Sequence, residues 1–208
     1  MRRINHVLSF LVGILITQMP PIAQAGTDFV WDLDGRPLRT SSQYYILPAP
    51  NQKIGSGLIL EGRNGSCPFN VAVSTRVSPG LPIIFSPAGA SDKVIRLSAD
   101  QNIRLFQAVT ICVQSTVWRL GGLDEATDKR FVTTGGVTGN PGSSTVSNWF
   151  KVERESEGVD NGRYKLVFCP GVCSFCKVIC GNLGVYNVNG RNWLALGDPA
   201  LSIVFKEI

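Results

Sequence analysis

Short strand-like segments separated by turn residues are the feature that most constrains the fold of this chain. Runs rich in Val, Ile, Leu, Tyr, Phe and Trp recur, and Gly, Pro, Asn and Asp stand between them. In one run Tyr164, Leu166 and Phe168 lie at alternate positions, so they share one face of a strand. Beyond the first 25 residues no window shows the 3.6-residue period of an amphipathic helix. We therefore predict an all-β chain of about a dozen short strands, a barrel or a sandwich.

The predicted strands and turns alternate along the whole chain. The clearest strand-like runs are residues 44–47, 57–60, 82–85, 117–120, 149–152, 164–168 and 202–206. Three aromatic segments faintly resemble one another, at residues 117–120 (VWRL), 148–151 (NWFK) and 192–195 (NWLA). Either large aromatic residues simply recur in a β core, or the three segments mark an internal repeat.

The first 25 residues have the three parts of a secretory signal peptide. Arg2 and Arg3 precede an uncharged run at residues 7–16, and Ala23 and Ala25 provide a small-x-small cleavage site. The apolar run is about half of what is needed to cross roughly 30 Å of hydrocarbon, which disfavours a membrane anchor. We expect a signal peptide over 1–25 and a single domain over 26–208. The mature protein is then secreted or enclosed in a vacuole, without membrane association.

The single histidine, His6, falls within this signal peptide. Ser-His-Asp and Cys-His catalytic arrangements are therefore excluded from the mature chain, and so is the commonest metal ligand. Carboxylates at i, i+2, such as Asp32 with Asp34 and Glu153 with Glu155, are weak evidence for catalysis. The net charge of +5 is spread without a long basic run, so a nucleic-acid partner is not implied. We expect no enzyme activity, no metal and no cofactor.

Six cysteines behind a signal peptide predict three disulfides. Two stand apart and four are clustered: Cys67 and Cys112, then Cys169, Cys173, Cys176 and Cys180. The clustered spacing is also compatible with a zinc or iron–sulfur site, but an oxidising compartment favours disulfides. Six cysteines allow fifteen pairings. Among these, a hairpin would produce a nested pattern, Cys169 with Cys180 around Cys173 with Cys176.

Several blocks of the sequence resemble the plant Kunitz-type inhibitors of the β-trefoil kind. Residues 28–38 (DFVWDLDGRPL) and 44–47 (YYIL) resemble their opening signature, and further blocks follow in order to the last strand near Phe205. The four-cysteine segment at 169–181 is similar to that of the miraculin-like branch. The resemblance implies a β-trefoil with three pseudo-repeats and about twelve strands, in which the aromatic similarity would be a trace of the repeat. It also implies the disulfides Cys67–Cys112, Cys169–Cys180 and Cys173–Cys176.

The resemblance implies a secreted plant defence protein that inhibits endopeptidases, above all trypsin-like serine proteases, through an exposed substrate-like loop. The loop falls on Ser86, Pro87, Ala88, Gly89, Ala90, Ser91, Asp92, Lys93 and Val94. Lys93 is the first candidate for the residue that fills the protease specificity pocket (P1), and Arg96 is the second. A basic P1 side chain suits an acidic, trypsin-like pocket.

Two features of this loop indicate weaker inhibition. Gly89 adds flexibility, which raises the entropy cost of docking. Thr40 aligns with an asparagine that braces the loop in strong inhibitors of the family. The alternative is therefore a storage or structural defence protein whose loop no longer inhibits. Inhibition of a cysteine protease through another surface is neither supported nor excluded by any residue.

Two smaller expectations concern covalent modification. Asn64, Gly65 and Ser66 form an N-x-S sequon, which permits a glycan on Asn64 in a secreted protein. A covalent dimer of the miraculin-like kind requires an additional cysteine before the block that here reads YKLVFCP. The corresponding residues 153–161 contain no cysteine, so we do not expect a covalent dimer.

Overall fold

The computed structural model describes residues 28–89, 91–106, 108, 111–156 and 162–208. The predicted signal peptide, residues 1–25, and Ala90 of the predicted loop lie outside these residues. The strands are β1 (Tyr44–Pro48), β2 (Leu58–Glu61), β3 (Asn70–Val73), β4 (Ile83–Pro87), β5 (Gln101–Leu105), β6 (Arg119–Asp124), β7 (Lys129–Thr133), β8 (Lys151–Arg154), β9 (Tyr164–Phe168), β10 (Gly181–Val188), β11 (Arg191–Leu196) and β12 (Ile203–Glu207). Two short 3-10 helices accompany them, η1 (Arg63–Gly65) and η2 (Ser143–Asn148). The all-β prediction is confirmed.

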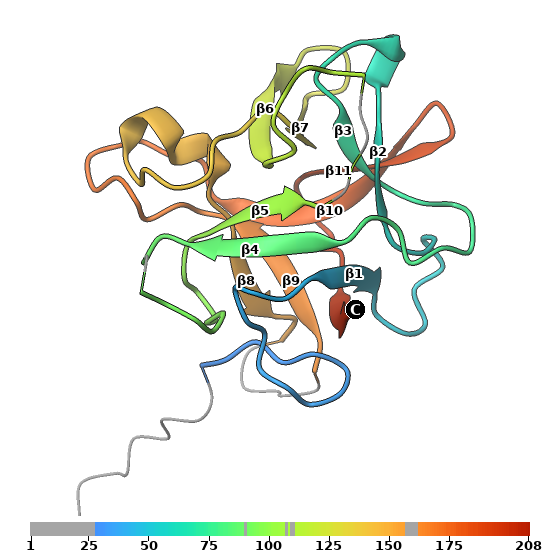
Figure 1. The fold of residues 1–208 in the computed structure, drawn as a ribbon. Coiled ribbons are helices and arrows are strands. Elements are labelled where there is room, and N and C mark those ends of the chain that lie inside the picture. The colour runs from blue at the N-terminus through green and yellow to red at the C-terminus, as the bar shows by residue number, and fades with distance from the viewer. Residues whose placement is uncertain (1–27, 90, 107, 109–110, 157–161) are drawn as a thin grey trace, which may run out of the picture.

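Six strands form a closed barrel (Figure 1). Around it, β1 pairs with β4, β4 with β5, β8 with β9, β9 with β12, and β12 with β1. Between β5 and β8 the barrel is closed by a bridge of Gln101 with Phe150, whose two backbone hydrogen bonds measure 2.7 and 2.9 Å. Each barrel strand therefore has a neighbouring strand on both sides, although β5 and β8 are joined by this one bridge.

The other six strands form three hairpins, β2–β3, β6–β7 and β10–β11. The hairpins also pair with one another, through β3, β7 and β11. Each run of four consecutive strands therefore supplies two barrel strands with a hairpin between them, three times along the chain. This arrangement is the β-trefoil, and the predicted three-fold architecture is confirmed.

The barrel interior is filled from alternate positions of the strands, as the period of two requires. Phe85 and Tyr164 each pack against Phe205 with ring centroids 5.7 Å apart. Phe150 contacts the ring of Trp118 at 6.0 Å and that of Phe168 edge-on at 5.6 Å. These rings are buried, and such edge-on contacts are a favoured aromatic geometry.

The three aromatic segments do not mark the repeat, so that prediction was wrong. Trp118 directly precedes β6, Trp149 directly precedes β8, and Trp193 lies within β11. These are the second, fourth and third strands of their repeats, so the positions are not equivalent. Each tryptophan is nevertheless buried, because large aromatic side chains fill several different parts of a β core.

The three-fold repeat is visible instead in the register of the barrel. The residue pairs Phe85–Ile103, Val152–Leu166 and Phe205–Ile46 occupy equivalent positions across β4–β5, β8–β9 and β12–β1. All six side chains are buried. They are apolar but of different kinds, which is why single-residue identity did not reveal the repeat.

The three predicted disulfides are confirmed, with Cα–Cα distances of 5.7 Å for Cys67–Cys112, 4.4 Å for Cys169–Cys180 and 5.4 Å for Cys173–Cys176. The nested pair closes the connection of β9 to β10, which run antiparallel. All six cysteines of the chain are therefore paired within it. In the part of the chain described here, no helix is long and apolar enough to span a membrane.

Candidate functional site

The predicted loop connects two neighbouring barrel strands, β4 and β5 (Figure 1). We call residues 88–100 the β4–β5 loop, residues 88–92 its tip and residues 93–97 its return arm. Ser86 and Pro87 are the last residues of β4 and pair with β5. The next residue, Ala88, donates its backbone N–H to the carbonyl oxygen of Asp100 at 2.9 Å. The loop therefore leaves the barrel from a closed base.

Within the tip, Gly89 and Asp92 are joined by a backbone contact. Asp92 donates its backbone N–H to the carbonyl oxygen of Gly89 at 3.0 Å. Gly89 and Ser91 are exposed, as is Lys93 immediately after the tip. A side chain at position 89 would meet the Asp92 carboxylate, because a Cβ there would lie 2.7 Å from Oδ2. The glycine thus leaves room for Asp92 to fold back over the turn.

The return arm pairs with the N-terminal segment of the domain. Ile95 donates its N–H to the carbonyl of Leu38 at 2.8 Å and accepts from the N–H of Val30 at 3.0 Å. Its side chain is fully buried. Thr40 donates its backbone N–H to the carbonyl of Lys93 at 3.2 Å. Thr40 therefore contacts the return arm through its backbone, and its role as loop support stays a prediction.

Because of this pairing, the two candidate P1 residues, Lys93 and Arg96, already have contacts that they would not have in a free peptide. The Lys93 side chain is exposed, but its carbonyl oxygen already accepts the Thr40 N–H. A P1 carbonyl must enter the oxyanion hole of the protease, so Lys93 would have to exchange one donor for another. The guanidinium of Arg96 lies 4.7 Å from the centre of the Phe29 ring. The next residue, Leu97, donates its backbone N–H to the carbonyl oxygen of Asp28 at 2.8 Å.

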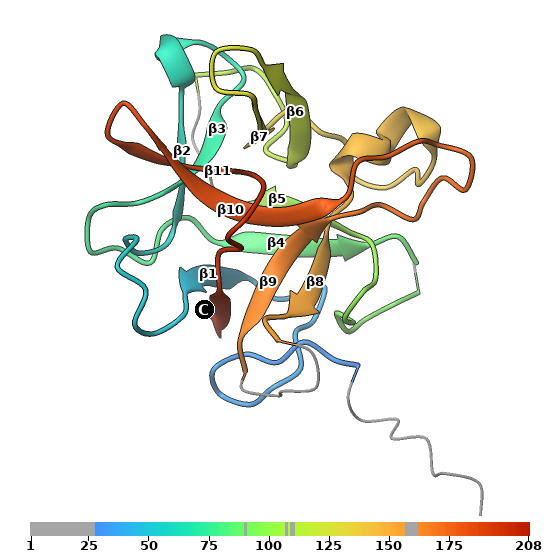
Figure 2. The ribbon, with the colours of Figure 1, turned by 180° about the vertical axis from the view of Figure 1, so that it is seen from behind.

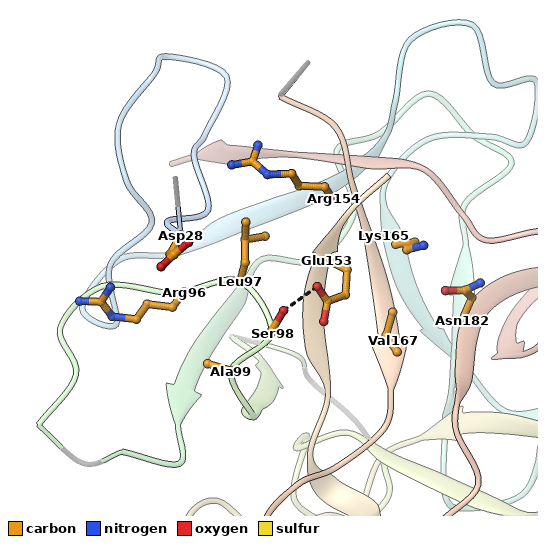
Figure 3. A pocket seen from close by; sticks show the side chains of 10 residues that line it. All are labelled: Asp28, Arg96, Leu97, Ser98, Ala99, Glu153, Arg154, Lys165, Val167 and Asn182. Atoms are coloured by element: carbon orange, nitrogen blue, oxygen red, sulfur yellow. Dashed lines mark hydrogen bonds between the residues drawn. The ribbon is translucent and has the colours of Figure 1, made fainter. Parts of the chain in front are cut away.

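A surface hollow of about 800 Å³ lies behind the return arm, between it and strands β8 and β9 (Figure 3). Across it, Ser98 donates its hydroxyl to Oε2 of Glu153 at 2.8 Å and its backbone N–H to the carbonyl of Val152 at 3.0 Å. Ser98 has a φ of 60°, an uncommon conformation outside glycine. These contacts attach Ser98, the residue after the return arm, to strand β8.

Asp100 joins the base of the loop to a distant part of the chain. Its carboxylate oxygens accept the backbone N–H of Gly171 at 2.9 and 3.2 Å, and Lys151 Nζ lies 4.0 Å away. Burial raises the pKa of Asp100, although the Gly171 N–H and Lys151 oppose the rise. Sequence analysis missed this contact, because the two residues are 71 positions apart and neither belongs to a local motif.

The sequon lies away from this loop. Asn64 is the middle residue of η1, and the following residues Gly65, Ser66 and Cys67 are exposed. A glycan on Asn64 remains a prediction.

The described part of the chain is thus a closed β-trefoil barrel with a β4–β5 loop whose return arm pairs with the segment from Val30 to Thr40. The comparisons with known proteins define its class. Residues 30–207 match the Kunitz legume family, described as trypsin and protease inhibitor. The chain therefore belongs to this family of Kunitz-type inhibitors.

Two relatives and one solved structure illustrate the similarity. The chain is 42% identical over 210 residues to miraculin from Synsepalum dulcificum, covering 95% of this chain and 93% of the relative. It is 38% identical over 199 residues to Kunitz trypsin inhibitor 5 from Arabidopsis thaliana, covering 95% and 94%. The structure of a Kunitz-type cysteine protease inhibitor from potato matches with a TM-score of 0.72 and 28% identity, covering 86% and 96%.

Proposed function

We propose that this protein is a secreted or vacuolar plant defence protein that inhibits trypsin-like serine endopeptidases through residues 86–94. The observation that carries the proposal is a loop closed at its base by Ala88 and paired along its return arm, with Gly89, Ser91 and Lys93 exposed, in a chain of an inhibitor family. Members of such a family act by binding an enzyme, so we propose no catalytic activity of the chain's own. The relatives named for trypsin and cysteine protease inhibition support protease binding as the shared activity.

Restriction of the loop before binding is the physical basis of the inhibition. Ordering a flexible segment opposes association, and the contacts of Ala88, Thr40 and Ile95 fix much of the loop in advance. The exposed Lys93 side chain can then reach an acidic specificity pocket. Its carbonyl leaves the Thr40 N–H and enters the oxyanion hole. Because one hydrogen bond replaces another, the net cost is on the order of 1 kcal/mol or less.

The test is a titration of folded residues 26–208 against trypsin and chymotrypsin, with two variants that each remove one cation. Lys93→Ala should weaken trypsin inhibition by about a hundredfold or more, the loss typical of a central anchor residue. Arg96→Ala is the matched control and should change it little. Trypsin inhibition that survives in Lys93→Ala would show that another residue occupies the specificity pocket.

A second candidate function is a storage or structural role with a loop that no longer inhibits. The observation that favours it is the Lys93 carbonyl, which is paired with Thr40 rather than free for an oxyanion hole. In that case protein with three intact disulfides would inhibit neither trypsin nor chymotrypsin. The same titration therefore decides between the two functions.

A further inference from the structure

The connection of β9 to β10, residues 169–180, is a second rigid projection of the molecule. We call it the disulfide loop. Cys169–Cys180 closes its base, and Cys173–Cys176 closes a small ring at its end. Ser174 and Phe175 form the turn within that ring. Cross-links at both levels restrict the backbone before any partner binds, which lowers the entropy cost of association.

Phe175 is exposed over 81% of its surface, whereas the other described aromatic side chains are buried or half-buried. A single exposed apolar residue is ordinary, but this one sits on a doubly cross-linked turn. Large aromatic side chains on rigid supports are typical anchors of protein interfaces. Nearby, Ile179 is 45% exposed and borders a hollow of about 240 Å³ that Val178 and Phe168 also line.

Asp100 connects this projection to the β4–β5 loop. Its backbone carbonyl holds Ala88 at the start of one loop, and its carboxylate holds Gly171 at the start of the other. Both views of the fold show the two loops projecting from the same side of the barrel (Figures 1 and 2). A protease docked on one loop would therefore meet the other, given the roughly 800 Å² that a standard interface covers on each partner.

The conformation of the disulfide ring indicates which kind of protease surface it could contact. Ser174 and Phe175 form a tight turn closed by the disulfide, whereas a segment read as substrate is extended. The ring therefore does not fit a substrate groove. Lys177 is exposed on the same loop, and together with Arg130 it places positive charge at the hollow that Ile179 borders.

We propose that Phe175 is a second docking anchor, which inserts into an apolar, acid-rimmed depression outside the catalytic groove of the endopeptidase bound at the β4–β5 loop. The inference rests on the proposed function and adds a surface to it. The disulfide ring holds the phenyl group in place, and Asp100 keeps the two loops in fixed relation.

The experiment uses trypsin, chymotrypsin and subtilisin as probes, with folded residues 26–208. Phe175→Ser should weaken inhibition of the most tightly bound probe about ten- to hundredfold, mainly through faster dissociation. Phe175→Leu, which keeps an apolar side chain, should retain most of it. Val77→Ser is the matched control, because Val77 is fully exposed between β3 and β4 and belongs to neither loop. Mass spectrometry confirms three disulfides in each variant.

A double-mutant cycle tests the connection between the loops. Asp100→Ala releases Gly171, so Phe175→Ser should cost less in that background than in the wild type. If the wild type inhibits a probe and Phe175→Ser inhibits it equally, the inference is wrong and the proposed function stands. If the wild type inhibits none of the probes, both fail. Analytical ultracentrifugation tests for self-association. If the wild type self-associates and Phe175→Ser does not, Phe175 binds a second copy of the chain and the inference is wrong.

Discussion

At the scale of single residues, backbone groups hold the candidate loop more than side chains do. The N–H groups of Ala88, Ile95 and Thr40 each bind a carbonyl across the loop or its support. Such contacts depend on the path of the chain and tolerate many side chains. Position 40 is an example, because Thr40 contacts Lys93 through the N–H that every residue except proline carries.

A longer side chain at position 40 should strengthen that support. Thr40→Asn adds two amide donors beside the loop, and one further hydrogen bond is worth about 1 kcal/mol. We expect trypsin inhibition to tighten about fivefold, measured as the inhibition constant. Thr40→Val keeps the backbone contact without the hydroxyl and should leave inhibition unchanged. A Thr40→Asn variant that inhibits no better than Thr40→Val would contradict this role of the position.

Asp100 should make a distinctive contribution to the pH dependence of stability. Because burial raises its pKa, folding favours the protonated form, and this contribution to stability is lost as the pH rises through the folded pKa. Asp100→Asn removes the titration. The free energy of unfolding of the variant minus that of the wild type should therefore be larger at pH 7 than at pH 3, as measured by urea unfolding.

Asp124 provides a control of opposite sign for the same measurement. A hydrogen bond from the Thr127 hydroxyl lowers the pKa of Asp124, and Arg63 at 3.0 Å adds to the effect. Its contribution to stability is present above the unfolded pKa and is lost in acid as the pH falls through the folded pKa. For Asp124→Asn the same difference should be smaller at pH 7 than at pH 3. Shifts of equal sign in both variants would refute these assignments.

At the scale of elements, the disulfides, through the family resemblance, were predicted more accurately than the individual strand boundaries. The run at 164–168 coincides with β9, because large apolar residues stand at alternate positions, which are the buried ones, and its last residue precedes Cys169. The run predicted at 117–120 is displaced, since β6 begins at Arg119 and extends through two glycines to Asp124. Strand β5 was missed: Gln101 and Asn102 are buried polar residues, which break the apolar pattern at its start.

Among the elements, the long bridge Cys67–Cys112 should matter most for global stability. It joins positions 45 residues apart, for which the loop-entropy relation gives about 4 kcal/mol. The double variant Cys67→Ser, Cys112→Ser should lower the free energy of unfolding by about that amount, measured with guanidinium. Replacing Cys173 and Cys176 instead, which are 3 positions apart, should cost less. If removing Cys173–Cys176 costs more than removing Cys67–Cys112, strain rather than loop length determines how much each disulfide stabilises the fold.

At the scale of the whole molecule, the fold rests on a barrel closed by a short contact. Strands β5 and β8 meet only at the Gln101–Phe150 bridge among the described pairings, and the Phe150 ring lies between Trp118 and Phe168. Phe150→Ala should therefore cost about 3 to 5 kcal/mol of stability, the range for a buried aromatic residue. Phe175→Ala is the exposed control and should cost little, as measured by urea unfolding.

The three-fold architecture and the contact between the two loops differ in how far sequence could predict them. The family blocks and the turn signals predict the trefoil and its disulfides, because the trefoil and the disulfides depend on the order of local segments along the chain. The placement of Lys93 against Thr40, and of Asp100 against Gly171, depends on how the closed barrel brings distant segments together. The resemblance to the family linked position 40 to the loop, but it did not predict the backbone contact with Lys93. No signal in the neighbouring residues predicts the contact of Asp100 with Gly171.

Whether the β4–β5 loop is presented as a substrate can be tested by finding which bond an endopeptidase attacks. Folded residues 26–208 are equilibrated with a catalytic amount of trypsin, and the products are mapped by mass spectrometry. If the β4–β5 loop is presented as a substrate, we predict one slow cleavage, at the bond after Lys93, with the rest of the chain intact. Cleavage at other exposed lysines or arginines while the bond after Lys93 survives would contradict the account.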